Sequence, residues 1–160
     1  DALSIAELSR ALGINRTTVY YHFENRDQLI DEVKAWSAMQ LAKAFKKDRS
    51  HQERIDHITR FVLENPQLIK LWIDDFIAGG DIRASYPMWD ELVAGMRENF
   101  TAIGAPDVDV EVFCINLLTS AFIGPRVFKS SVCPAADNET VVERFRGESM
   151  RMLKDLSLLD

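Results

Sequence analysis

Apolar residues recur at spacings of three and four along nearly the whole chain, which is the pattern of amphipathic helices. No segment shows the strict alternation of apolar and polar residues that a half-buried strand requires. The predicted fold class is therefore all-α. The predicted helices are a short one capped by Ser4, then 16–22, about 26–47, one through Ile55 and Val62 that Asn65 ends, one from Pro66 to Gly79, one from Trp89 to Phe100 closed by Gly104, one from Asp109 to about Ser130, and one from Val141 to Leu156.

Prolines and glycines mark the expected ends and interruptions of these helices. Pro66 is expected in the first turn of its helix, where a missing N–H costs nothing, and Gly79 and Gly80 should stop that helix. Pro125 lies inside the long apolar segment, where we expect it to kink or interrupt the helix. Residues 133–137, which include Pro134, are expected to form a loop.

The first 26 residues carry the pattern of a helix-turn-helix. Gly13 would supply the positive φ of a tight turn after the first helix, with Ile14 turned inward. Asn15 is a good N-cap for the second helix, and the small Ser9 would let the two helices approach. The inward residues are Ile5, Leu8, Ala11 and Leu12 in the first helix and Val19 and Phe23 in the second, and Glu7 completes a capping box with Ser4.

The outward residues of the second helix can all donate hydrogen bonds. They are Arg16, Thr17, Thr18, Tyr20, Tyr21 and His22. A recognition helix presents its first residues to base edges in the major groove of double-stranded DNA, while neighbouring residues hold phosphates. Arg16 would read guanine and Thr17 would contact thymine, whereas Tyr20, His22 and Arg26 suit phosphate oxygens. The alternative is an ordinary exposed helix start.

The stretch from Leu3 to Leu29 resembles the DNA-binding domain of the TetR family of one-component transcriptional regulators. The resemblance rests on Gly13-Ile14-Asn15, on Thr18-Val19-Tyr20-Tyr21-His22-Phe23 and on Asn25-Arg26-Asp27-Gln28-Leu29. In that family the Tyr-x-His-Phe stretch ends the recognition helix, and a Lys or Arg, here Arg26, begins a long linking helix. Family members have one more helix before this motif, whereas this chain starts at Asp1, so we expect a basic amphipathic helix ahead of it.

The net charge of the chain argues against DNA binding. Its formal net charge is -6 and its pI is about 5.1, whereas nucleic-acid binders are usually basic. Residues 1–34 contain four basic residues (Arg10, Arg16, Arg26 and Lys34) and six acidic ones, which gives them a net charge of -2. DNA binding would therefore depend on where the basic groups point and not on their sum.

Size and composition indicate a folded chain in a reducing compartment. The 160 residues are 47% hydrophobic and 28% charged, which suits one domain or two small ones that share a core. We expect a DNA-binding domain over residues 1–34 and a helical ligand-binding and dimerisation domain over residues 35–160. Two cysteines cannot build a disulfide framework, which favours the cytoplasm. No run of about 18 apolar residues and no signal peptide are present, so no membrane association is expected.

Catalytic and metal-binding patterns have little support in the sequence. His51 and His57 are six residues apart, which does not place them on one helix face with a third ligand. Cys114 lies in an apolar helix and is expected to be a core residue. We find no glycine-rich phosphate loop and no nucleophile elbow. We therefore expect neither enzymatic activity nor a cofactor.

A group of large side chains in the second domain is a candidate effector site. Its members are Trp72, Asp75, Phe76, Trp89, Met96, Phe100, Phe113 and Leu117. Large aromatic and Met side chains beside a few polar groups can hold an apolar or amphipathic small molecule, although each one alone is more often plain core. Asp74, Asp75, Asn116 and Thr119 are candidates to orient the ligand. Asp75 would suit a cationic ligand, and the alternatives are a solvated face or an ion pair with Arg83 or Arg126.

The last two helices have more apolar positions than one ordinary buried face needs. The family resemblance implies that they pack against their twins as a four-helix homodimer interface. Ser120, Ala121 and Gly124 would allow close approach, and Phe128, Phe145, Met152 and Leu156 would fill the gaps. The alternative is that these residues bury against their own chain.

Together these patterns predict a ligand-responsive transcriptional repressor. It would bind a palindromic operator as a homodimer and be released by a small molecule, through the helix that starts at Arg26. The competing hypothesis is a helical small-molecule binding or catalytic domain whose helix-turn-helix is incidental.

Overall fold

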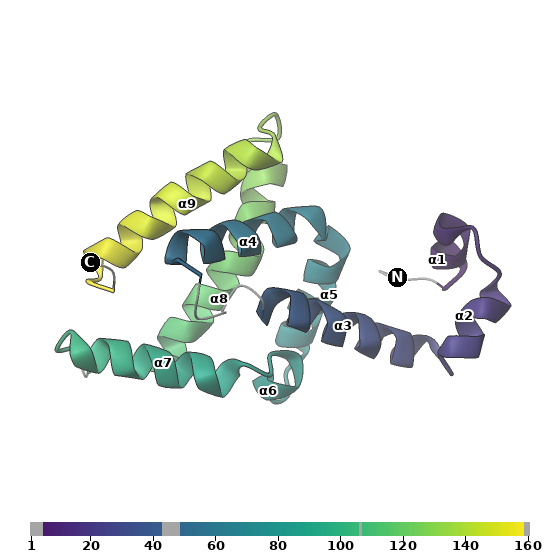
Figure 1. Cartoon of the computed structure of the whole chain (residues 1–160), viewed down its shortest axis with the longest axis horizontal. Coiled ribbons are helices and arrows are strands. Elements are labelled where there is room, and N and C mark those ends of the chain that lie inside the picture. The colour runs from purple at the N-terminus through teal and green to yellow at the C-terminus, as the bar shows by residue number, and fades with distance from the viewer. Residues whose placement is uncertain (1–4, 43–48, 106, 159–160) are drawn as a thin grey trace.

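Every regular element in the part of the chain that the structure describes is a helix, as the sequence pattern predicts. The computed structural model describes residues 5–42, 49–105 and 107–158 (Figure 1). The elements are α1 (Ile5–Leu12), α2 (Arg16–His22), α3 (Arg26–Ala42), α4 (His51–Glu64), α5 (Pro66–Ala78), α6 (Ile82–Ser85), α7 (Trp89–Ala102), α8 (Val110–Val127), the π-helix η2 (Phe128–Val132) and α9 (Asn138–Asp155). The Ser4 cap and the last turn of the predicted 26–47 helix lie outside the described residues.

Local side-chain caps set several of the helix starts. The Asn15 side chain accepts a hydrogen bond from the Thr17 N–H at the start of α2. Ser50 and Glu53 form a reciprocal capping box at the start of α4, in which each side chain accepts the other's backbone N–H. Asp109 caps α8 by accepting the backbone N–H three residues ahead at 3.1 Å. These interactions join neighbours in sequence, so the sequence alone predicts where the helices begin.

Pro66 and Gly79 bound α5 as predicted, but the next helix is absent from the sequence prediction. Pro66 is the first residue of α5, and Gly79 follows its end with a φ of 85°. The single turn α6 comes next, and the Asp81 side chain caps it by accepting the Arg83 N–H at 2.9 Å. A four-residue helix is too short for a hydrophobic period to mark it.

Pro125 leaves the α-helix intact, so the predicted interruption occurs later in the chain. The helix α8 continues through Pro125 to Val127. The backbone then widens into η2, where the Cys133 N–H reaches back five residues to the Phe128 carbonyl at 2.8 Å. Pro125 has no backbone N–H and therefore removes one hydrogen bond from the helix, and this loss does not end α8.

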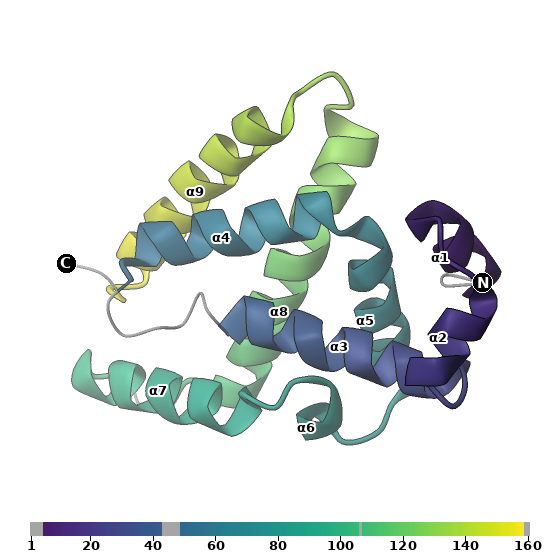
Figure 2. The same ribbon diagram turned by 45° about the vertical axis from the view of Figure 1, so that its right-hand side comes forward.

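The main hydrophobic core lies where α3, α4, α5, α7 and α8 meet. Its buried residues are Leu41, Phe61, Val62, Ile69, Trp72, Tyr86, Trp89, Val93, Phe100, Val110, Cys114, Leu118 and Phe122. A separate cluster of Leu63, Val141 and Val142 joins α4 to α9. The remaining cluster holds α1 and α2 against the start of α3, at the end of α3 away from α7 and α9 (Figures 1 and 2).

One helical stretch is long and apolar enough to cross a membrane, by length and composition alone. It is Val110–Val132, with a mean hydropathy of 1.3. Cys114, Leu118 and Phe122 on this stretch lie in the main core. A core helix passes the same test, so one such stretch is weak evidence for a membrane span.

Candidate nucleic-acid interface

The turn between α1 and α2 is a Schellman motif built on Gly13. Gly13 has a φ of 64°, and its N–H donates to the Arg10 carbonyl at 3.3 Å. The Ile14 N–H donates to the Ser9 carbonyl at 3.0 Å, which completes the pair of bonds that defines this motif. The positive φ predicted for Gly13 is confirmed, because only this backbone conformation brings both N–H groups back onto the helix end.

Ile14 itself is 39% exposed, so the prediction that it turns inward is wrong. In a Schellman motif the residue after the glycine packs against the last turn of the preceding helix. That turn presents the small Ser9, which is itself buried, and therefore offers Ile14 little surface to cover. The interior is closed instead by Ile5, Val19 and Leu29.

The second helix, α2, buries one side chain and exposes the rest of its residues. Val19 is 4% exposed and packs against α1 and α3, with Phe23 partly buried beside it. The six outward residues predicted to contact DNA are all exposed, and they are Arg16, Thr17, Thr18, Tyr20, Tyr21 and His22. Tyr21 is 86% exposed, and its ring meets the His22 ring edge-on at 5.2 Å. The structure therefore gathers these donors on one short helix that a groove can reach.

The start of α3 continues the same surface. The Asn25 side chain accepts the Gln28 N–H at 2.9 Å, and the Gln28 side chain accepts the Glu24 N–H at 2.6 Å. This pair of bonds fixes the chain between α2 and α3, with Arg26 exposed in the first turn of α3. Within the described residues Arg16 makes no ion pair, so its guanidinium is available to an anion or a base edge.

The predicted effector residues occupy two separate aromatic clusters. Around Trp72, the rings of Phe76, Tyr86 and Phe122 all meet the indole edge-on, and the Phe122 centroid is the nearest at 5.4 Å. Phe100 and Phe113 form the second cluster at 4.9 Å. Trp89 is buried in the main core, Met96 packs against it, and Leu117 is partly buried.

A pocket of about 440 Å³ lies at the junction of α7 and α8. Of the predicted effector residues, only Phe100 lines it. Its lining includes the charged residues Arg97, Asp109 and Glu111. A second pocket of about 430 Å³ lies along α4 and is lined by none of the predicted effector residues. The interior between Trp72 and Phe122 is filled by the rings themselves.

The polar residues proposed to orient a ligand have other partners. Asp75 pairs with Lys34 at 2.6 Å, and neither Arg83 nor Arg126, the two candidates from the sequence, is its partner. Asp74 pairs with Lys70 at 2.7 Å. Asn116 and Thr119 are exposed on the outer face of α8, so their predicted place beside a buried ligand is wrong.

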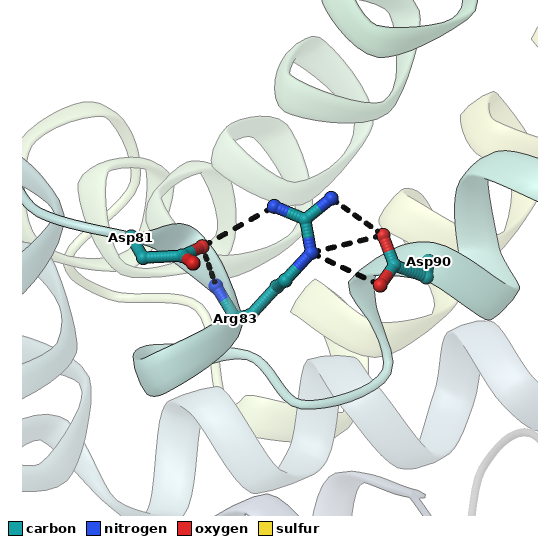
Figure 3. Close-up of polar contacts among 3 residues, drawn as sticks. All are labelled: Asp81, Arg83 and Asp90. Carbon is teal, nitrogen blue, oxygen red and sulfur yellow. Dashed lines mark hydrogen bonds and ion pairs between the residues drawn. The ribbon is translucent and has the colours of Figure 1, made fainter.

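Arg83 joins the start of α6 to the start of α7 (Figure 3). Its guanidinium donates to Asp90 at 2.7 Å and to Asp81 at 3.3 Å, and these bonds raise its pKa above the usual value. The same segment buries Tyr86, and this burial raises the pKa of the Tyr86 phenol to about 12. Both groups therefore keep one protonation state across the physiological range, and Arg83 is engaged away from Asp75.

The predicted dimer residues divide into two sets. Gly124 lies against Phe145 of its own chain, because a Cβ at Gly124 would approach the Phe145 ring to 3.0 Å. Phe145 also meets Phe128 edge-on at 5.9 Å, so these residues pack within the chain, as in the alternative reading of the sequence. Of the other predicted interface residues, Ser120, Met152 and Leu156 are exposed and Ala121 is partly buried. Val112, Ile115 and Val127 on α8 are exposed as well, although the prediction did not name them.

Sequence reasoning missed the residues that attach α3 to the rest of the chain. Ser37 is fully buried on α3, and its hydroxyl accepts the Trp72 indole N–H at 2.9 Å. His57 on α4 bonds the Gln40 carbonyl near the end of α3, also at 2.9 Å. The period of Ile30, Ser37 and Leu41 places Ser37 on the buried face of α3, and this is the signal that could have singled it out.

No group of three or more His, Cys, Asp and Glu side chains in the described residues could hold a metal ion. Cys114 is fully buried, as predicted, and this burial raises the pKa of its thiol.

A tight glycine turn, one anchoring residue and an exposed row of donors define a helix-turn-helix DNA-binding unit. Residues 1–33 match the family model of the bacterial regulatory proteins of the tetR family. The N-terminal part of the chain is therefore similar to the DNA-binding domain of the TetR-family transcriptional regulators, and such regulators are typically not enzymes. No curated protein and no solved structure matches the chain.

Proposed function

We propose that this regulator is a repressor that binds a palindromic operator as a homodimer and is released by a small molecule. The observation that carries the DNA-binding part is the exposure of α2, where Val19 alone is buried and the flanking donors all face solvent. This is the division of labour in a recognition helix: one residue anchors it, and the others are free to meet base edges and phosphates.

Base reading is assigned to the first turn of α2 and phosphate contact to its end. Arg16 and Thr17 lie at the N-terminus of α2, where a recognition helix meets base edges in the major groove. Tyr20, Tyr21, His22 and Arg26 follow toward the start of α3 and would hold the backbone, with Thr18 between the two groups. Glu24 and Asp27 are exposed nearby, and we expect them to limit nonspecific affinity for DNA.

The exposed apolar residues of α8 and α9 support the homodimer. Val112, Ile115 and Val127 recur at helical spacing on the outer face of α8, interspersed with uncharged Asn116, Thr119 and Ser120. The uncharged part of this face, from Val112 to Ser120, suits burial against a second copy through a twofold axis. A palindromic site needs two recognition helices about 34–36 Å apart, which a symmetric pair of chains supplies.

The effector is proposed to act on the helices that form the main core, which we call the regulatory body, at the aromatic clusters of Trp72 and Phe100. Because edge-to-face rings fill this interior, a ligand has to displace side chains in order to enter. Trp72, Phe76, Trp89, Met96, Phe100, Phe113 and Leu117 remain the proposed apolar lining. A cationic ligand at Asp75 would have to compete with Lys34 for the carboxylate.

A mobility-shift titration of the full-length protein on its own upstream DNA tests this function. We expect binding that weakens steeply with salt and that Arg16→Ala and Tyr20→Ala reduce. Arg97→Ala, which removes the same charge from α7, is the matched control and should leave binding unchanged. Binding that is absent or unaltered by the two α2 variants contradicts the DNA-binding assignment. A monomeric mass at micromolar concentration contradicts the homodimer.

A further inference from the structure

The helix α3 belongs to both units of the molecule. Its first half carries Leu29 and Val33, which pack on α1 and α2, whereas Ala38 and Leu41 in its second half pack in the main core. Figures 1 and 2 show α1 and α2 at the free end of α3, with α5 crossing α3 nearer to the main core. The position of α1 and α2 relative to the main core is therefore set by how α3 lies on its neighbours.

Two polar contacts fix α3 against α5. Lys34 Nζ lies 2.6 Å from the Asp75 carboxylate, and the Trp72 indole N–H donates to Ser37 Oγ at 2.9 Å. Lys34 and Ser37 are three residues apart on α3, and Trp72 and Asp75 are three apart on α5, so the contacts run in antiparallel register. A turn of α3 about its axis, or a slide along α5, would break both at once.

Both donors at the inner contact, the Ser37 hydroxyl and the Trp72 indole N–H, are engaged. Ser37 is fully buried, and its hydroxyl donates to the Lys34 carbonyl at 2.8 Å while it accepts from Trp72. Separation of α3 from α5 would leave the Trp72 N–H buried without a partner, and such a loss is costly in a dry interior. The outer Lys34–Asp75 pair is about one-third exposed and therefore contributes less.

Trp72 connects this contact to the interior of the body. Its indole meets Phe76, Tyr86 and Phe122 edge-on, and these residues belong to α5, to the segment before α7, and to α8. Any molecule that enters between these rings has to move Trp72, and the movement pulls its N–H away from Ser37. The Trp72 ring therefore contacts the interior of the body and also holds α3 in place.

We propose that Trp72 and Ser37, with Lys34 and Asp75, form a clamp that sets the angle of α3. An effector would open this clamp and so release the reading head, which consists of α1, α2 and the first half of α3. The proposal rests on the proposed function for the effector, but the clamp itself is a property of one chain. Trp72 and Ser37 act as positioning residues, because neither lies on the DNA-binding surface.

The test measures the distance between the two units directly. Spin labels at Arg10→Cys on α1 and Glu98→Cys on α7, both exposed positions, report the head-to-body distance by double electron–electron resonance. Cys133→Ser removes the partly exposed cysteine, and the fully buried Cys114 stays unlabelled. Labelled chains are diluted into unlabelled ones so that only distances within a chain are recorded.

We expect Ser37→Ala and Trp72→Phe each to broaden the distance distribution, and the double variant to broaden it no further, because both remove the same bond. Val93→Ala is the control. It trims another buried side chain of the main core, on α7 and outside the contact between α3 and α5, and should leave the distribution unchanged. On unlabelled full-length protein, the two clamp variants should bind the upstream DNA roughly twofold to tenfold more weakly, and Val93→Ala should bind as the parent does.

A distribution in the clamp variants that matches the parent and Val93→Ala, with all variants folded by circular dichroism, would overturn the clamp. If Ser37→Ala does not fold, Asp75→Asn breaks the outer contact with a side chain of the same shape and should broaden the distribution by a smaller amount. Broadening in a protein that never binds its upstream DNA supports the clamp and rejects the proposed function. If the parent binds its upstream DNA and the variants show no broadening, the proposed DNA binding is supported and the clamp is rejected.

Discussion

The reading head and the regulatory body of this regulator are held together in different ways. The head, formed by α1, α2 and the first half of α3, buries Ile5, Val19 and Leu29 and relies on local features such as the Gly13 turn and the Asn15 cap. The body buries a core shared by five helices. The buried cluster of the head is completed by Leu29 of α3, so the described part of the head depends on α3, whereas the body has a core of its own. A head attached in this way can be repositioned without unfolding the body.

The largest expected effect lies in the body. Phe122→Ala removes a ring that is 4% exposed and packed edge-on against Trp72, and it should lower the free energy of unfolding by about 3–5 kcal/mol. Urea denaturation followed by circular dichroism measures this. Ile77→Ala on α5, whose side chain is 80% exposed, is the control and should change the value by less than about 0.5 kcal/mol. Equal losses in the two variants would refute the placement of the core.

The next effect separates function from stability in the head. Arg16→Ala should weaken binding to the specific DNA site by about 1–3 kcal/mol and leave the free energy of unfolding unchanged, because Arg16 is exposed and makes no ion pair within the described residues. Fluorescence anisotropy with a labelled operator fragment gives the affinity. A loss of stability equal to the loss of affinity would mean that Arg16 supports the fold and does not read DNA.

A glycine substitution tests the local character of the head. Gly13→Ala should destabilise the head by about 1–2 kcal/mol, because Gly13 has a φ of 64°, which an alanine adopts only with strain. A Cβ there would meet no other atom, so the loss would come from the backbone conformation alone. Gly13→Asn should lose less, since asparagine tolerates this conformation. Gly147→Ala inside α9 is the matched control, and it should stabilise the protein by about 0.5–1 kcal/mol. Hydrogen exchange resolved to α1 and α9 measures both, and a neutral Gly13→Ala would contradict the turn.

The smallest effect concerns a local cap in the body. Hydrogen bonds from the backbone and side chain of Ser50 hold the pKa of Glu53 below its ordinary value. The cap therefore contributes stability above the unfolded pKa of a glutamate, and the contribution is lost as the pH falls through the lowered value. Ser50→Ala should raise the pKa of Glu53 toward the ordinary value in a carboxylate NMR titration. Asp137, whose pKa is lowered by the Thr140 N–H, should not change, and an unmoved Glu53 would exclude the capping box.

Much of the head could be predicted from the sequence, because its determinants act over a few residues. Gly13 and Asn15 mark the turn and the cap, and the spacing of Val19 marks the anchored face of α2. Ile14 was mispredicted because its exposure depends on what the neighbouring helix offers it, and the small Ser9 offers little surface. The candidate DNA-contacting residues follow from the exposure of α2, whose periodicity the sequence already displays.

The body shows what a hydrophobic pattern leaves open. The pattern predicts that Trp72, Asp75 and Gly124 lie on helices, but not which residues face them. The partner of Asp75 is Lys34, because α3 crosses α5 in antiparallel register, and Gly124 meets Phe145 of its own chain, because α9 folds back onto α8. Helix type, caps and turns were thus determined by the sequence through contacts between near neighbours. The pairing of helices and the clamp on α3 were decided only by the tertiary structure, because residues far apart in the chain have to meet before those contacts exist.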